Sequence, residues 1–190
     1  MRILLAALAG AVAMFVWTAI AHMATPLAFT GFSKMANEPA ALHAMTSENV
    51  GAKPGLYIFP WVDPKDPKMM EKYQALAKSG PTGMLLYRPV GQEMRADMTP
   101  MLIKEFLKQF AQALIAAWIV SMIAAGFVTR VGVVTAIGAS AGIATNVSYW
   151  NWYGYPTDYT LAQITIEVVS ALVAGLAIAA VLRGKTHKPA

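Results

Sequence analysis

One acidic side chain lies inside an apolar stretch, and it is the residue in this chain best suited to chemistry. The apolar segment begins near Thr160, and Glu167 lies about two helical turns after that start. A charge at mid-membrane costs roughly 2.5–3.5 kcal/mol on insertion scales, so Glu167 should be protonated, meet a partner or face other helices. At helical spacing, the helix face that carries Glu167 has polar side chains toward one end and small side chains toward the other. The neighbours on that face are Gln163, Ser170, Ala171 and Ala174.

Four more polar residues are expected at a similar depth. With the apolar segments oriented as described below, His22, Gln112, Asn146 and Gln163 fall in the outer half with Glu167. We expect them to form a polar cluster among the helices. One interpretation is a ligand, ion or proton site at the mouth of a helix bundle. The other is interhelical hydrogen bonding, in which Asn146 and Gln163 satisfy a protonated Glu167.

Small residues predict where helices pack closely. Gly138 and Gly142 form a GxxxG step, which lets two helix backbones approach each other. Ala171 and Ala174 place small side chains on the face that carries Glu167. These four residues are expected to form a packing seam, within the chain or with a partner, although the spacing also arises by chance in segments rich in small residues.

Known catalytic and metal-binding patterns are missing from the sequence. It has no cysteine, and so no disulfide, thiolate metal site or cysteine nucleophile. It also has no GxSxG, HExxH, P-loop or GxGxxG pattern. His22, His43 and His187 show no paired spacing for a metal or haem. We therefore expect no catalytic residue, metal or cofactor, and expect His22 to cap the end of the first apolar segment.

The composition is that of a membrane protein. Of 190 residues, 57% are hydrophobic and only 13% charged, against roughly 25% charged in ordinary globular domains. The charges crowd into one region and nearly vanish from three others, which indicates spans alternating with an aqueous segment. The net charge of +5 could indicate nucleic acid or anionic lipid. Orientation in a membrane explains several of these charges, so we expect lipid contact and no nucleic acid.

Four apolar segments predict an all-α, four-helix transmembrane bundle. The first is long for the core of a cleaved signal peptide, which is typically about 7–15 residues, so we expect a retained anchor. A capped helix starting at Thr99 should continue into the second span. The expected order is transmembrane helix 1 (1–22), an extracytoplasmic α+β domain inserted between helices 1 and 2 (23–106), helix 2 (107–129), helix 3 (130–149), an outer aromatic loop (150–159), helix 4 (160–182) and a basic tail (183–190).

The inserted domain shows short alternating element signals. Turn residues separate a predicted helix over 37–45, a strand over 56–61, a helix over 68–78 and a strand over 84–88. So small a strand–helix–strand unit has a thin core. We expect it to rest on the bilayer or on another protein.

Basic residues set the expected orientation. Arg2, Arg130 and Arg183 flank apolar segments on one side, and Lys185 and Lys188 follow in the tail. Because cytoplasmic loops are rich in Lys and Arg, both termini are expected to be cytoplasmic. The loop expected on the opposite side of the membrane, 150–159, instead fits an interfacial aromatic belt. That belt comprises Trp150, Trp152, Tyr153, Tyr155 and Tyr159.

Several stretches resemble a known family. They are MFVWTAIAHM, GLYIFPW, GPTGMLLYRP and NVSYWNWYGYPTDYTLAQ, of which NVSYWNWYG is the most distinctive. Together they resemble a family of small, uncharacterised bacterial inner-membrane proteins. The resemblance implies a bacterial source, the inner membrane and a four-span layout, and it implies no activity.

Three functions are compatible with these observations. The first is a non-enzymatic accessory or assembly subunit that contacts other membrane proteins, or copies of itself, through the inserted domain and the helix seams. The second is a small oligomeric transporter or proton-coupled carrier that uses Glu167. The third is a membrane haem or metal protein that uses His22.

Overall fold

The computed structural model describes residues 1–47, 50, 53–89 and 97–182 and is mostly helical. It divides into two compact units. The bundle unit joins Met1–Phe32 to Asp97–Ala190, and the inserted unit spans Ser33–Ala96. The predicted basic tail, 183–190, lies outside the described residues.

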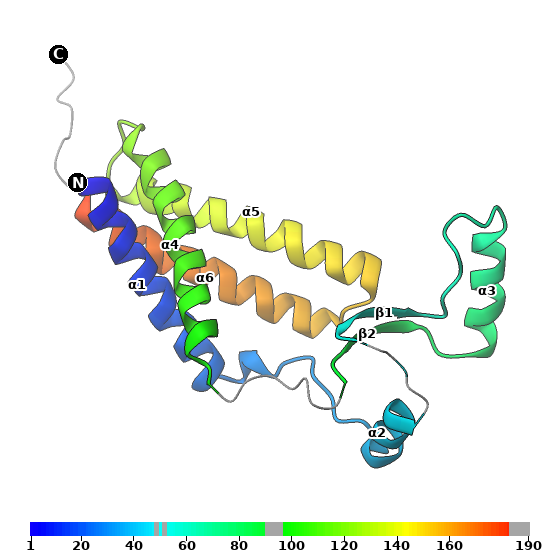
Figure 1. Cartoon of the computed structure of the whole chain (residues 1–190). Coiled ribbons are helices and arrows are strands. Elements are labelled where there is room, and N and C mark those ends of the chain that lie inside the picture. Colours follow the sequence, from blue (N-terminus) through cyan, green and yellow to red (C-terminus); the bar gives the residue numbers. More distant parts are fainter. Residues whose placement is uncertain (48–49, 51–52, 90–96, 183–190) are drawn as a thin grey trace. The chain divides into compact units, whose positions relative to one another are not determined.

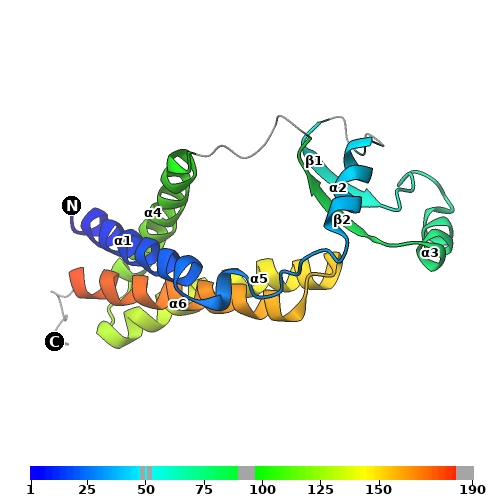
Figure 2. The ribbon, with the colours of Figure 1, turned by 90° about the horizontal axis from the view of Figure 1, so that it is seen from below.

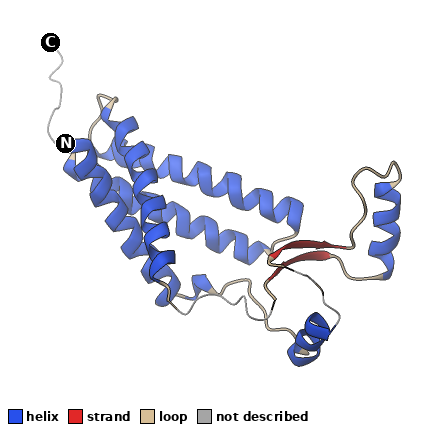
Figure 3. Ribbon diagram, viewed as in Figure 1, coloured by secondary structure: helices blue, strands red, loops and turns tan. Residues whose placement is uncertain are grey.

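Four long helices make up the bundle unit (Figure 1, Figure 3). They are α1 (Arg2–Met23), α4 (Thr99–Ser121), α5 (Phe127–Tyr153) and α6 (Thr157–Val181). Three of them, α1, α5 and α6, are long and apolar enough to cross a membrane, which indicates a membrane protein. Helix α4 is more polar, because Lys104, Glu105 and Lys108 occupy its first three turns.

The helices pack in the spatial order α4, α1, α6, α5, so α1 lies between α4 and α6 (Figure 1, Figure 2). A Cβ on Gly10 of α1 would come within 2.9 Å of two side-chain atoms of Ile178 in α6 and 3.2 Å from Ala113 in α4. The core at these contacts is built largely from alanine, which suits close helix approach. Its buried alanines are Ala6, Ala7, Ala11, Ala113, Ala116, Ala117 and Ala174.

Helix α4 ends earlier than the sequence predicted. The second span was expected over 107–129, but the helix stops at Ser121 and α5 begins at Phe127. In the last turn of α4 the Ser121 hydroxyl donates to the carbonyl of Trp118 at 2.7 Å. The apolar part of α4 from Phe110 onward is therefore only about 18 Å long, against roughly 30 Å of hydrocarbon.

The expected outer aromatic loop, 150–159, is mostly helical. Helix α5 continues through Tyr153, and Gly154 ends it in the left-handed conformation with a φ of 71°. Three residues later α6 begins at Thr157. The prediction failed because no glycine or proline lies between Tyr149 and Gly154, and aromatic residues at a membrane boundary can belong to a helix end as well as to a loop.

The inserted unit contains two helices and a two-stranded sheet. Its elements are α2 (Glu38–Ser47), β1 (Gly55–Phe59), α3 (Met69–Ser79) and β2 (Gly83–Tyr87). These bounds lie within two residues of the predicted ones. The strands are antiparallel, with Leu56 opposite Leu86 and Ile58 opposite Met84.

The inserted unit is held mainly by local contacts. The amide of Ala40 donates to the Asn37 side chain at 3.3 Å at the start of α2. Before α3, a hydrogen bond from the Lys72 ammonium and a second from the Lys68 backbone hold the pKa of Asp66 below its ordinary value. None of the described residues of this unit is buried.

Candidate functional site

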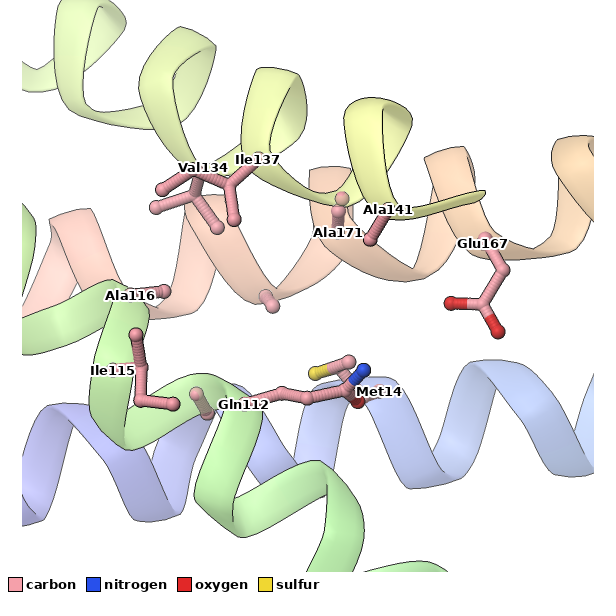
Figure 4. Close-up of a pocket in the computed structure, with 12 residues that line it drawn as sticks. Met14, Gln112, Ile115, Ala116, Val134, Ile137, Ala141, Glu167 and Ala171 are labelled. Carbon is pink, nitrogen blue, oxygen red and sulfur yellow. The ribbon is translucent and has the colours of Figure 1, made fainter. Parts of the chain in front are cut away.

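Glu167 lies deep within α6. It follows Thr157 by about 15 Å in a helix roughly 37 Å long. A Cβ built on Gly142 of α5 would lie 3.2 Å from the Glu167 Cβ, so the missing side chain of Gly142 lets α5 approach at this point. The Glu167 carboxylate points away from α5, into the space bounded by α1 and α4 (Figure 4).

An apolar cavity of about 160 Å³ adjoins the carboxylate. All four long helices line it, and Figure 4 shows Met14 and Gln112 facing it from α1 and α4. Gln112 and Glu167 are the only polar side chains in this lining. The apolar lining comprises Met14, Ala113, Ile115, Ala116, Val134, Ile137, Gly138, Ala141, Ala171 and Ala174.

A more polar groove of about 450 Å³ lies on the other side of Glu167, between α1, α4 and α6. Its polar side chains come from three helices and are Thr18, His22, Glu105, Lys108, Gln163 and Glu167. Because Glu167 lines both spaces, we treat them as one feature and call it the α1 cleft. The α1 cleft has a polar end toward the α1 C-terminus and an apolar end toward the middle of α1.

A hydrogen-bonded network fills the wall of the α1 cleft between α1 and α4. The Gln109 amide donates to Thr18 at 3.0 Å and to Glu105 at 3.1 Å. The Lys108 ammonium donates to the same Glu105 oxygen at 2.7 Å. Gln109 is 1% exposed, and its carbonyl oxygen has no partner within the described part of the chain. Gln109 was not among the residues predicted from the sequence, although it follows Glu105 by four residues and therefore shares its helix face.

Glu167 itself makes no hydrogen bond or ion pair among the described residues. The expected hydrogen bonds from Asn146 and Gln163 are therefore not part of this structure. The Asn146 amide donates instead to the carbonyl of Gly142 in its own helix, at 2.9 Å, and Asn146 lines neither part of the α1 cleft. A side-chain amide can satisfy itself on the preceding turn in this way without a second helix.

The structure places three of the five residues expected in the polar cluster along one groove. His22 and Gln163 lie with Glu167 in the polar end, and Gln112 lies with Glu167 in the apolar end. The His22 Nδ1 is 2.8 Å from the carbonyl of Thr18 in the last turn of α1, as a capping residue would be.

The GxxxG step of α5 lies against α6. A side chain on Gly138 would overlap the Cβ of Ala171, so both residues must be small for the helices to approach this closely. Ala174 is 2% exposed and belongs to the alanine-rich core with residues of α1 and α4. The indole of Trp17 adds a polar tie between α1 and α6, donating to the carbonyl of Ile166 at 3.0 Å.

Aromatic rings gather where α5 passes into α6. The Trp150 indole donates to Thr157 at 3.1 Å across the short link. The rings of Tyr149 and Tyr155 stack with centroids 5.5 Å apart, and the Tyr155 and Tyr159 rings are 5.3 Å apart. Of the residues expected in the belt, Trp152 is 77% exposed and Tyr153 50% exposed.

Neither metal chemistry nor a known relative assigns a role to the α1 cleft. Among the residues that the structure describes, no three His, Cys, Asp or Glu side chains are grouped to hold a metal ion. Comparisons with protein-family models, curated proteins and solved structures found no match to this chain. The proposals below therefore rest on the chain itself.

Proposed function

We propose that this protein is a non-enzymatic accessory or assembly subunit of a membrane complex, and that its inserted unit docks on another membrane protein. One observation carries the proposal. None of the described residues of the inserted unit is buried, and one face of its sheet is uncovered and apolar. On that face Leu56 is 63% exposed, Ile58 47% and Leu86 74%.

An isolated two-stranded sheet is at best marginally stable in water, and it gains stability when a further strand or layer covers it. Within the described residues, β1 and β2 pair only with each other, so each strand has one free edge. A free edge beside an apolar face suits an extended segment of a partner that adds a strand and covers Leu56 and Leu86. The occupant that we propose is therefore such a segment of a neighbouring membrane subunit.

The proposed membrane topology has four spans. They are α1, α5 and α6, which are apolar enough to cross a membrane, and the more polar α4. Support comes from chain direction. In α1, Gly10 contacts Ile178 and the later Trp17 donates to the earlier Ile166, so α1 is antiparallel to α6. In α5, Gly138 contacts Ala171 and the later Gly142 contacts the earlier Glu167, so α5 is also antiparallel to α6 and runs the same way as α1. With α1 and α5 both spanning, the proposed return crossing between them is α4, whose 23 residues are about 34 Å long when its polar first turns are included.

We further propose a bacterial inner membrane with both termini in the cytoplasm. The family resemblance supports the location. The orientation is supported by Arg130, whose guanidinium donates to the carbonyl of Leu182 at 2.8 Å. This bond holds the basic start of α5 beside the end of α6, so both lie on one side of the bundle. Basic residues at span ends favour the cytoplasmic side.

The docking proposal predicts position-specific crosslinking in cells. A photoreactive phenylalanine at Leu86, on the apolar face, should give an adduct with one other membrane protein. The same probe at Lys78, on exposed α3, is the matched control and should not. Adducts are identified by mass spectrometry after solubilisation in mild detergent.

A paired purification completes the test. The double variant Leu56→Asn/Leu86→Asn should lose the stoichiometric partner, while the thermal unfolding of the bundle unit stays unchanged because neither residue belongs to it. Crosslinks from position 86 to lipid alone, or only to a second copy of this chain, would contradict docking on a different subunit.

A further inference from the structure

We propose that the α1 cleft binds a membrane lipid with a primary-amine headgroup. The ammonium pairs with Glu167, and one acyl chain occupies the apolar end. This inference does not depend on the docking function of the inserted unit. It rests on the charge pattern, shape and depth of the α1 cleft.

The charge pattern leaves one carboxylate unmatched. Glu105 accepts from both Lys108 and Gln109, so its charge is already compensated. Glu167 has no such partner among the described residues, although it lies about 15 Å along α6 from Thr157. At that depth an ionised carboxylate needs a cation, and a primary ammonium offers both the charge and N–H donors.

A basic group at the polar end, the Lys108 ammonium, suits the phosphate that joins such an amine to its glycerol. The Lys108 ammonium has three N–H donors and uses one of them on Glu105, and its side chain is 48% exposed. A zwitterionic headgroup would thus meet an acidic group at Glu167 and a basic group at Lys108 within one groove.

The shape of the α1 cleft favours a chain-bearing ligand over a small solute. Beyond Glu167, ten of the twelve lining residues are apolar, and the cavity of about 160 Å³ has room for part of a hydrocarbon chain. Ile115 and Ile137 on its rim are 56% and 37% exposed, so the lining extends to the surface of the helices. Because α1, α5 and α6 are the candidate spans, lipid is the solvent that meets this surface.

The test measures lipid retention by the purified full-length chain, using native mass spectrometry in a mild detergent. Dioleoyl phosphatidylethanolamine and dioleoyl phosphatidylglycerol share their acyl chains and differ in the amine. The wild-type chain should prefer the amine lipid by roughly tenfold or more, as expected for a desolvated charge pair. Glu167→Gln should remove this preference, and Glu167→Asp should keep most of it.

Three further lipid-retention measurements test the proposed lipid site. Glu105→Gln is the matched control, because it removes the other carboxylate of the same groove, which is already paired with Lys108. This variant should keep the preference for the amine lipid. Ala141→Trp, at an exposed position of the apolar end, should reduce retention of both lipids. Butylamine, which carries the amine without the chain, should not displace the lipid at equal concentration. Equal binding of the two lipids by a folded wild-type chain, an unchanged preference in Glu167→Gln, or displacement by butylamine would overturn the proposal.

Discussion

Replacing Gly138 with leucine should lower the thermal unfolding midpoint of the detergent-solubilised protein by on the order of 2–12 °C. Even a single methyl group at Gly138 would overlap the Cβ of Ala171, so a leucine must push α5 away from α6. Overpacking of this kind costs typically 1–3 kcal/mol, and each kcal/mol moves the midpoint of a chain this size by about 2–4 °C. Circular dichroism at 222 nm follows the loss of helix.

A glycine on the same helix provides the control. A Cβ on Gly132 would meet nothing within 4 Å, so Gly132→Leu makes the same chemical change without a clash. Its midpoint should not fall and should rise by about 1–4 °C, because leucine has the better helix propensity. Equal midpoints for the two variants would mean that α5 and α6 do not pack through Gly138.

Replacing Gln109 with glutamate should destabilise the bundle unit by several kcal/mol. The Gln109 side chain is 1% exposed and donates to Glu105, so the variant places a second carboxylate beside the first and removes the donor between them. An uncompensated buried charge costs about 3–5 kcal/mol. The thermal midpoint should therefore fall by roughly 6–20 °C at neutral pH.

The pH dependence of this variant separates charge from shape. Protonation of the new carboxyl restores a neutral side chain of nearly the same size, so much of the lost stability should return as the pH is lowered. Gln109→Met, which keeps the length without polar atoms, should be close to wild type because it also removes the unpartnered carbonyl oxygen. A loss for Gln109→Met as large as that for Gln109→Glu would show that the network, and not burial of charge, sets the stability.

Much of the architecture could be predicted from the sequence because lipid leaves few alternatives. Long apolar runs must be helical in a bilayer, and this rule placed α1, α5 and α6. Helix α4 shows the limit of the rule. Its start followed from Thr99 and Pro100, but its end at Ser121 lies inside an apolar run, so hydrophobicity alone does not locate it.

The candidate site could be predicted in part. A carboxylate in an apolar run identified Glu167, and helical spacing placed Gln163 near it. Asn146 was wrongly expected to join them, because a side-chain amide can bond its own helix backbone. Gln109 was overlooked because it stands among charged residues at the polar start of α4, and its burial depends on how α4 lies against α1.

The proposed return of the chain through α4 can be tested most directly by cysteine labelling in right-side-out membrane vesicles. The chain has no cysteine of its own, so single cysteines at Ser79 in α3 and at Ala124 between α4 and α5 report unambiguously. A membrane-impermeant maleimide should label position 79 in sealed vesicles and position 124 only after permeabilisation. Labelling of both positions in sealed vesicles would place the two sites on one side of the membrane and contradict the four-span bundle.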